Sequence, residues 1–155
     1  MSNGPPGERE DSPRQWCFGC GESNDEGLHI EFEVSGLDVT GRFTPRKSHQ
    51  GFPGVAHGGI AAAVLDEAMG WAMYAANAWA MTARMEIRYR RPLSLDEPVI
   101  VTARVTRDRG RRLEAEAQIA TEDGEVLAQA DALFLRLPEE RSQQLGESFL
   151  GTPTA

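Results

Sequence analysis

The stretch VAHGGIAAAVLDEAMGWAMYAA, residues 55–76, decides the fold of this chain. It is apolar nearly all round, which predicts one helix from about His57 to Ala76 that other parts of the protein must surround. Two adjacent carboxylates, Asp66 and Glu67, lie in its middle. A buried ionised carboxylate without a partner costs several kcal/mol. Adjacent helical residues point about 100° apart. One acid can therefore reach an edge and solvent, whereas the other must be neutralised or face a cleft.

Both acids could be satisfied by backbone donors or at a subunit boundary. The absence of Lys and Arg from residues 48 to 83 means that the helix supplies no cation within one turn. Perturbed buried carboxylates concentrate at active sites. We therefore favour a functional role for at least one of the two acids.

Segments with the alternation of half-buried strands flank the helix. Residues 28–34 and 38–43 precede it, and residues 81–92, 98–106, 112–121 and 125–137 follow it, with the turn signals DRG and EDG between the last three. A single helix thus serves a sheet of about six strands, which predicts an α+β fold with a curved antiparallel sheet wrapped around one long central helix. Small residues keep the helix thin and would let the strands approach closely: Ala61, Ala62, Ala63, Ala68, Gly70 and Ala72.

Length and composition fit one domain with a real core. The chain has 155 residues, of which 40% are hydrophobic and 26% charged. The Pro- and Gly-rich residues 1–15 predict a disordered lead-in without a signal peptide, residues 16–137 the folded domain, and residues 138–155 a flexible tail. A net charge of −8 argues against nucleic acid as a partner, and no apolar run is long enough to cross a membrane. We therefore expect a cytoplasmic protein.

The two cysteines, Cys17 and Cys20, form the motif CFGC. This spacing is half of a zinc site, but His29, His49 and His57 do not form the second close pair of ligands that such sites usually have. A redox CxxC is expected at a helix start after a strand, and this one follows a predicted disordered tail. The pattern favours two reduced structural thiols and no metal.

Two further features suggest ligand chemistry. His57-Gly58-Gly59 places two glycines at the helix start, where backbone N–H groups lack intrahelical partners and could stabilise developing negative charge; the alternative is a tight entry turn. The segment RDRGRR, residues 107–112, is a compact basic spot on an acidic chain. It suggests a small anionic ligand, and a solvated hairpin tip explains it equally well.

The segment HGGIAAAVLDEAMG resembles the central-helix motif of the hotdog-fold acyl-CoA thioesterases, of the bacterial phenylacetate-pathway type and the mammalian thioesterase-superfamily-member type. In it, an acid follows the histidine by nine positions (66 − 57 = 9). The segments CFGCGESNDEGLHIEF, RYRRPL and VTARVTRDRGRRL resemble other parts of these proteins, so the likeness covers about residues 16 to 137. It implies the hotdog fold and an enzyme that hydrolyses acyl-coenzyme A without a cofactor.

The resemblance also implies roles for residues of the HGG motif and the following strand. The family's catalytic carboxylate matches Asp66, which would act as general base on water or as nucleophile, and its oxyanion donor matches the N–H of Gly58, flanked by His57 and Gly59. The residue that orients the water matches Thr82. Strand alternation puts Thr82 on the polar face, so a bulge or a neighbouring subunit must bring it to the acid. Some relatives have an asparagine before the motif, where Gln50 could supply a similar amide.

In the family, active sites form between subunits, which implies a homodimer or homotetramer. The resemblance assigns the acyl-CoA substrate to the basic hairpin and to Tyr89; the hairpin residues are Arg107, Arg109, Gly110, Arg111 and Arg112. Glu67 receives no chemistry. Two alternatives stay open. One is a hotdog hydratase or dehydratase with His57 as catalytic histidine, and the other is a non-catalytic acyl-CoA sensor, against which the presence of Asp66 argues.

Overall fold

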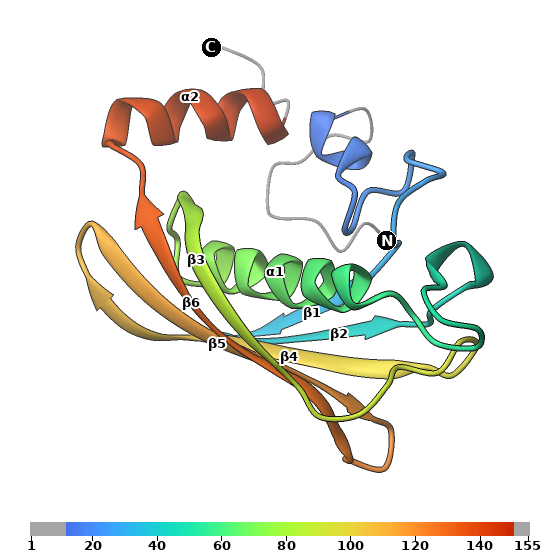
Figure 1. Ribbon diagram of the computed structural model, residues 1–155. Coiled ribbons are helices and arrows are strands. Elements are labelled where there is room, and N and C mark those ends of the chain that lie inside the picture. Colours follow the sequence, from blue (N-terminus) through green and yellow to red (C-terminus); the bar gives the residue numbers. More distant parts are fainter. Residues whose placement is uncertain (1–11, 151–155) are drawn as a thin grey trace.

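The predicted apolar helix is α1 (Gly58–Ala75), and it lies across the concave face of one curved six-stranded sheet (Figure 1). The computed structural model describes residues 12–150. All strand pairs are antiparallel, and the order across the sheet is β1-β2-β4-β5-β6-β3. The strands are β1 (Glu31–Ser35), β2 (Asp38–Phe43), β3 (Ala80–Tyr89), β4 (Val99–Arg109), β5 (Arg112–Thr121) and β6 (Val126–Arg136). The predicted α+β architecture is confirmed.

The core lies between α1 and the sheet. Buried helix residues recur at the spacing of one helix face, and the sheet contributes the inward side chains of its strands. Val64, Leu65 and Met69 are fully buried, as are Val101 and Ile119 on the central strands. Each buried side chain of this size stabilises the fold by roughly 1.5–3 kcal/mol, so this layer fixes where α1 lies on the sheet.

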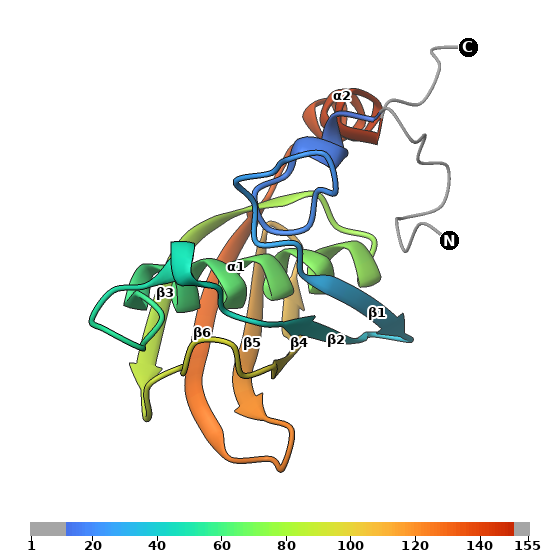
Figure 2. The same cartoon turned by 90° about the vertical axis from the view of Figure 1, so that its right-hand side faces the viewer.

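The opposite side of α1 is covered by the amino-terminal segment and by a second helix, as Figures 1 and 2 show. The Arg14 guanidinium lies 5.4 Å from the centre of the Trp71 ring, and the Phe149 ring stacks on Tyr74 at 6.4 Å. The sheet on its own therefore does not enclose the apolar helix. Residues from both ends of the domain complete the enclosure.

These two coverings correct the predicted domain boundaries. Residues 139–150, expected in a flexible tail, form the helix α2 (Glu139–Leu150). The short 3-10 helix η1 (Pro13–Trp16) lies partly within the lead-in that was expected to be disordered, and its Arg14 and Gln15 are buried. The rest of that lead-in, residues 1–11, lies outside the described residues. A second 3-10 helix, η2 (Lys47–His49), precedes the loop that enters α1. No helix within residues 12–150 combines the length and apolarity needed to span a membrane.

Strand β3 forms one edge of the sheet. It pairs with β6 on one side, and no strand within the described chain pairs with its other side. Two large apolar side chains on it are exposed, Met81 at 58% and Tyr89 at 55%. An unpaired edge with exposed apolar residues is a surface that natural proteins normally cover.

Candidate active site

Asp66 and Thr82 form a hydrogen-bonded pair between α1 and the edge strand β3. The Thr82 hydroxyl donates to the Asp66 carboxylate, with 2.7 Å between the two oxygens. Pairing with β6 shifts register between Thr82 and Arg84, so the bulge that strand alternation required is present. Asp66 is half-buried and Thr82 is exposed. The carboxylate is therefore held by a hydroxyl at an open strand edge instead of being enclosed in the core.

The start of α1 presents a backbone donor. The His57 imidazole caps the helix, because its Nδ1 accepts from the Gly59 N–H at 2.9 Å. The N–H groups of Ile60 and Ala61 donate to the His57 carbonyl. Among the residues of the structure, none accepts from the N–H of Gly58, which is exposed. This N–H, at the positive end of the helix dipole, can therefore donate to a ligand oxygen.

Two other predicted site residues support this helix start. The Tyr89 hydroxyl, at the end of β3, donates to the Gly58 carbonyl at 2.7 Å and thereby fixes the peptide next to the free donor. The Gln50 side-chain oxygen accepts from the Gly54 N–H at 3.0 Å, which stabilises the loop before the helix. The resemblance grouped Tyr89 with the basic hairpin as a substrate contact, and within one chain its hydroxyl contacts Gly58.

The acid and the backbone donor of one chain are far apart. Gly58 and Asp66 are separated by eight residues (66 − 58 = 8), which is about 12 Å along a helix. A carbonyl undergoing attack needs both groups at roughly 3 Å. Within one chain these two groups are therefore too far apart to act on the same carbonyl.

The basic segment forms the tight hairpin between β4 and β5, and Gly110 at its tip has a φ of +76°. Arg107 lies 3.8 Å from Glu114 across the hairpin. Arg136 donates to the Asp108 carboxylate and to the Gly110 carbonyl. The hydrogen bonds that Asp108 accepts from Arg136 and from the Gly110 N–H lower the pKa of its carboxyl group. For Arg109, Arg111 and Arg112 the described part of the chain contains no ion pair. These three guanidinium groups can meet an anion.

Sheet register places this hairpin at the Asp66 end of the molecule. Arg112 pairs with Leu135 on β6, and Leu135 pairs with Met81, the residue before Thr82. Tyr89 lies seven residues beyond Thr82 (89 − 82 = 7), roughly 23 Å along the strand. In one chain the basic hairpin and the Asp66–Thr82 pair thus share one end of β3, and Tyr89 and Gly58 share the other.

Glu67, to which the sequence assigned no chemistry, faces away from this edge and contacts the CFGC turn. The Cys17 thiol donates to its carboxylate, with 3.4 Å between sulfur and oxygen. Burial is the main reason that the pKa of Glu67 rises to about 7. Sequence spacing gave no signal for this contact, because the two partners are 50 residues apart.

Comparison with known proteins identifies the family. A model described as the thioesterase superfamily matches residues 53–128. Acyl-coenzyme A thioesterase THEM4 of Mus musculus is 32% identical over 124 residues, which cover 77% of this chain and 54% of that protein. This chain spans about half or less of the length of its curated relatives from four animals, since the matches cover 38% to 54% of those proteins.

Solved structures agree with the topology. A crystal structure of a thioesterase superfamily protein has a TM-score of 0.75 and 32% identity, over 78% of this chain and 60% of that one. A hypothetical thioesterase protein of Streptococcus pneumoniae, solved with coenzyme A, has a TM-score of 0.67 at 16% identity, over 70% and 85% of the two chains. At that identity the second match shows the fold alone. The chain therefore belongs to the thioesterase superfamily and has the hotdog fold, as its helix motif predicted.

Proposed function

We propose that the protein hydrolyses the thioester bond of acyl-coenzyme A at a site shared by two chains. One chain would supply Asp66 and Thr82, and its partner would supply the N–H of Gly58. The observation that carries this proposal is the Asp66 carboxylate itself. It is an acid in an otherwise apolar helix, held by a 2.7 Å hydrogen bond from Thr82 at an open strand edge.

The proposed chemistry uses the Asp66–Thr82 pair of one chain and the Gly58 N–H of the other. Asp66 accepts a proton from a water molecule, whose oxygen attacks the thioester carbonyl carbon; direct attack by the carboxylate is the variant of this step. Negative charge develops on the carbonyl oxygen and is stabilised by the Gly58 N–H and the helix dipole. The carbon–sulfur bond then breaks. Coenzyme A leaves with the proton as a thiol, and the acyl group leaves as a carboxylic acid.

The distance within one helix supports a shared site. Because about 12 Å separate Gly58 from Asp66 along α1, the two groups cannot act on one carbonyl from the same chain. Antiparallel pairing of β3 with the β3 of a second copy would bring the Tyr89 end of one chain to the Thr82 end of the other. It would also cover the exposed edge. We therefore propose a homodimer, or a tetramer built from such dimers.

The spacing of the acid and the hydroxyl gives further support. Thr82 follows Asp66 by 16 residues. Two of the solved Streptococcus pneumoniae structures are alanine variants, one at an aspartate and one at a threonine that follows it at the same spacing. The same protein was solved with coenzyme A, and a Streptococcus mutans protein with acetyl coenzyme A.

The nucleotide of the substrate would bind at the basic hairpin. Arg109, Arg111 and Arg112 lie at the same end of the sheet as Asp66, and arginine donates two parallel hydrogen bonds to a phosphate. Arg107, also assigned to this hairpin, is partly engaged by Glu114. We place the enzyme in a reducing compartment such as the cytoplasm, where the free thiols Cys17 and Cys20 persist.

The decisive experiment replaces Asp66 with asparagine, which keeps the shape of the side chain and removes the base. The kcat for hydrolysis of a panel of acyl-CoA esters, measured by the release of free thiol, should fall by a factor of ~10² or more. Asp25→Asn, at an exposed carboxylate in the amino-terminal loop, is the matched control and should keep normal activity. Hydrolysis by Asp66→Asn at near the normal rate would remove Asp66 from the mechanism.

A further inference from the structure

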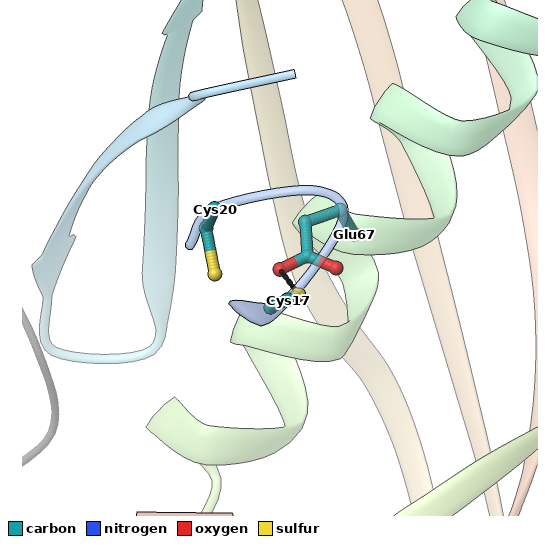
Figure 3. A group of neighbouring side chains, drawn as sticks. All are labelled: Cys17, Cys20 and Glu67. Atoms are coloured by element: carbon teal, nitrogen blue, oxygen red, sulfur yellow. Dashed lines mark hydrogen bonds between the residues drawn. The ribbon is translucent and has the colours of Figure 1, made fainter. Parts of the chain in front are cut away.

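A second cluster of reactive groups lies on the other side of α1 from the Asp66–Thr82 pair. Cys17 and Cys20 lie in the turn after η1, and Glu67 lies on α1. One ligand atom from each, two sulfurs and a carboxylate oxygen, all lie within 4.8 Å of one another (Figure 3). The thioester chemistry proposed above uses none of these groups.

The CFGC turn is built so that both sulfurs approach one point. Its chain closes tightly, since the Gly21 N–H donates to the Cys17 carbonyl at 2.9 Å, and a Cβ at Gly21 would overlap the Gln15 carbonyl oxygen.

Gly19 lets this turn lie directly on the helix carboxylate. A Cβ at Gly19 would overlap the end of the Glu67 side chain, so the glycine makes room for the third group of the cluster. On the far side, the buried Arg14 donates from Nη1 to the Cys20 sulfur at 3.2 Å. The two cysteines and the glutamate are therefore held in place by packing and hydrogen bonds.

Two thiolates and a carboxylate this close repel one another when all three are ionised, and the Arg14 guanidinium beside Cys20 offsets only part of this repulsion. A divalent cation at the centre would offset this repulsion and let each group bind in its deprotonated form.

We propose that Cys17, Cys20 and Glu67 bind a zinc ion and that Arg14 supports Cys20 from outside the first ligand shell. Two thiolates select zinc over magnesium or calcium, which prefer oxygen ligands. Tetrahedral ligands at about 2.3 Å from the metal lie ~3.8 Å apart, so the cluster needs to contract by only about 1 Å. Three protein ligands leave one position for water.

The site would join two parts of the chain that are far apart in sequence. Cys17 and Glu67 are separated by 50 residues, and Glu67 is the residue after Asp66. A metal bound there would fix the amino-terminal segment to the turn of α1 that carries the proposed catalytic acid. The zinc site stands on its own geometry and does not depend on the thioesterase reaction.

The test is metal binding by the full chain after reduction and removal of metal by a chelator. Cobalt(II) is the probe, because thiolate ligation gives a charge-transfer band in the near ultraviolet and tetrahedral geometry gives strong visible bands. We expect one cobalt per chain and displacement of the cobalt by zinc, with no displacement by excess magnesium. Zinc should also raise the melting temperature, since it binds only the folded state.

Variants locate the site. Cys17→Ser, Cys20→Ser and Glu67→Gln should each weaken zinc binding by a factor of ~10² or more, because even outer-shell partners cost 10- to 100-fold. Glu22→Gln, an exposed carboxylate just after the turn, is the matched control and should bind normally. The wild-type chain alone can refute the proposal. If the folded, fully reduced protein shows no thiolate-to-cobalt band after cobalt is added, the proposal is overturned. The same holds if the protein is isolated with a Cys17–Cys20 disulfide and binds no metal after that disulfide is reduced. Equal zinc binding by folded Cys17→Ser and wild type would also overturn it.

Discussion

Replacing Gly58 with proline should remove one N–H group from the proposed oxyanion site while preserving the helix. Gly58 is the first residue of α1, a position that favours proline because its N–H has no intrahelical partner. The preceding residue, His57, has φ −58° and ψ 139°, the extended conformation that proline requires before it. Gly58→Ala is the matched control, since it keeps the N–H and its Cβ would lie 3.6 Å from the Tyr89 hydroxyl, an ordinary contact.

The expected loss is that of a single oxyanion donor. Gly58→Pro should lower kcat for acyl-CoA hydrolysis by ~10²–10³, equivalent to about 2.7–4 kcal/mol of transition-state stabilisation. Gly58→Ala should stay close to the normal rate. Release of free thiol measures both, and far-ultraviolet circular dichroism checks that the helix is retained.

Mixing two inactive variants then tests whether the site is shared. In a dimer of one Gly58→Pro chain and one Asp66→Asn chain, one site carries both lesions and the other carries neither. Random exchange makes about half of the dimers mixed, and each regains one of its two sites, so roughly a quarter of normal activity should return. If Gly58 and Asp66 acted from the same chain, every site would keep a lesion and mixing would restore nothing.

Two results would refute the reasoning. Absence of recovery, in a mixture where mass spectrometry shows mixed dimers, would exclude a site divided between chains. Equal loss of activity in Gly58→Pro and Gly58→Ala would mean that bulk at this position, and not the missing donor, is responsible.

Two further outcomes are expected. Replacing Arg109 and Arg111 with alanine should raise KM for acyl-CoA and leave kcat nearly unchanged, because the nucleotide is remote from the reacting carbonyl. Hydrolysis of a pantetheine thioester, which lacks the nucleotide, should be unaffected. Equal loss of activity with both substrates would mean that these arginines stabilise the fold and do not bind the nucleotide. Phe149→Ala should lower the free energy of unfolding, measured by urea titration, by about 1–2 kcal/mol, because its half-buried ring stacks on Tyr74. Phe52→Ala, at a side chain that is 86% exposed, should change it by less than ~0.5 kcal/mol. Similar values for the two variants would show that α2 adds no stability.

Hydrophobic periodicity was sufficient to predict the sheet and its helix, because their buried side chains are large and regularly spaced. Helix α2 was missed for a physical reason. Its inward face consists of Ser142, Leu145, Gly146 and Phe149, at the spacing of an amphipathic helix, but half of these residues are small. Gly146 packs against the Trp79 ring, where a Cβ would lie 3.2 Å away. A helix face made partly of small residues can pack closely against a bulky side chain, but it leaves little hydrophobic signal in the sequence.

The candidate site was predictable only where one motif contains it. The HGG motif and Asp66 lie on one helix, so their relation follows from the sequence. The contact between Thr82 and Asp66 depends on a bulge, and alternation alone places that hydroxyl on the wrong face. Tyr89 was grouped with the basic hairpin because both match coenzyme A contacts of the family, yet sheet register puts them at opposite ends of β3.

The adjacent acids in the apolar helix are explained by the geometry of the helix. Successive side chains point about 100° apart, so Asp66 reaches Thr82 at the open edge while Glu67 reaches the cysteine turn on the covered side. Each carboxylate thus has a polar neighbour from a different part of the chain, and neither is left alone in the core. Replacing Thr82 or Cys17 with an apolar residue would leave one carboxylate of α1 without this hydrogen bond. The same turn of helix therefore carries one residue of the proposed hydrolytic site and one ligand of the proposed zinc site, joined by a single peptide bond.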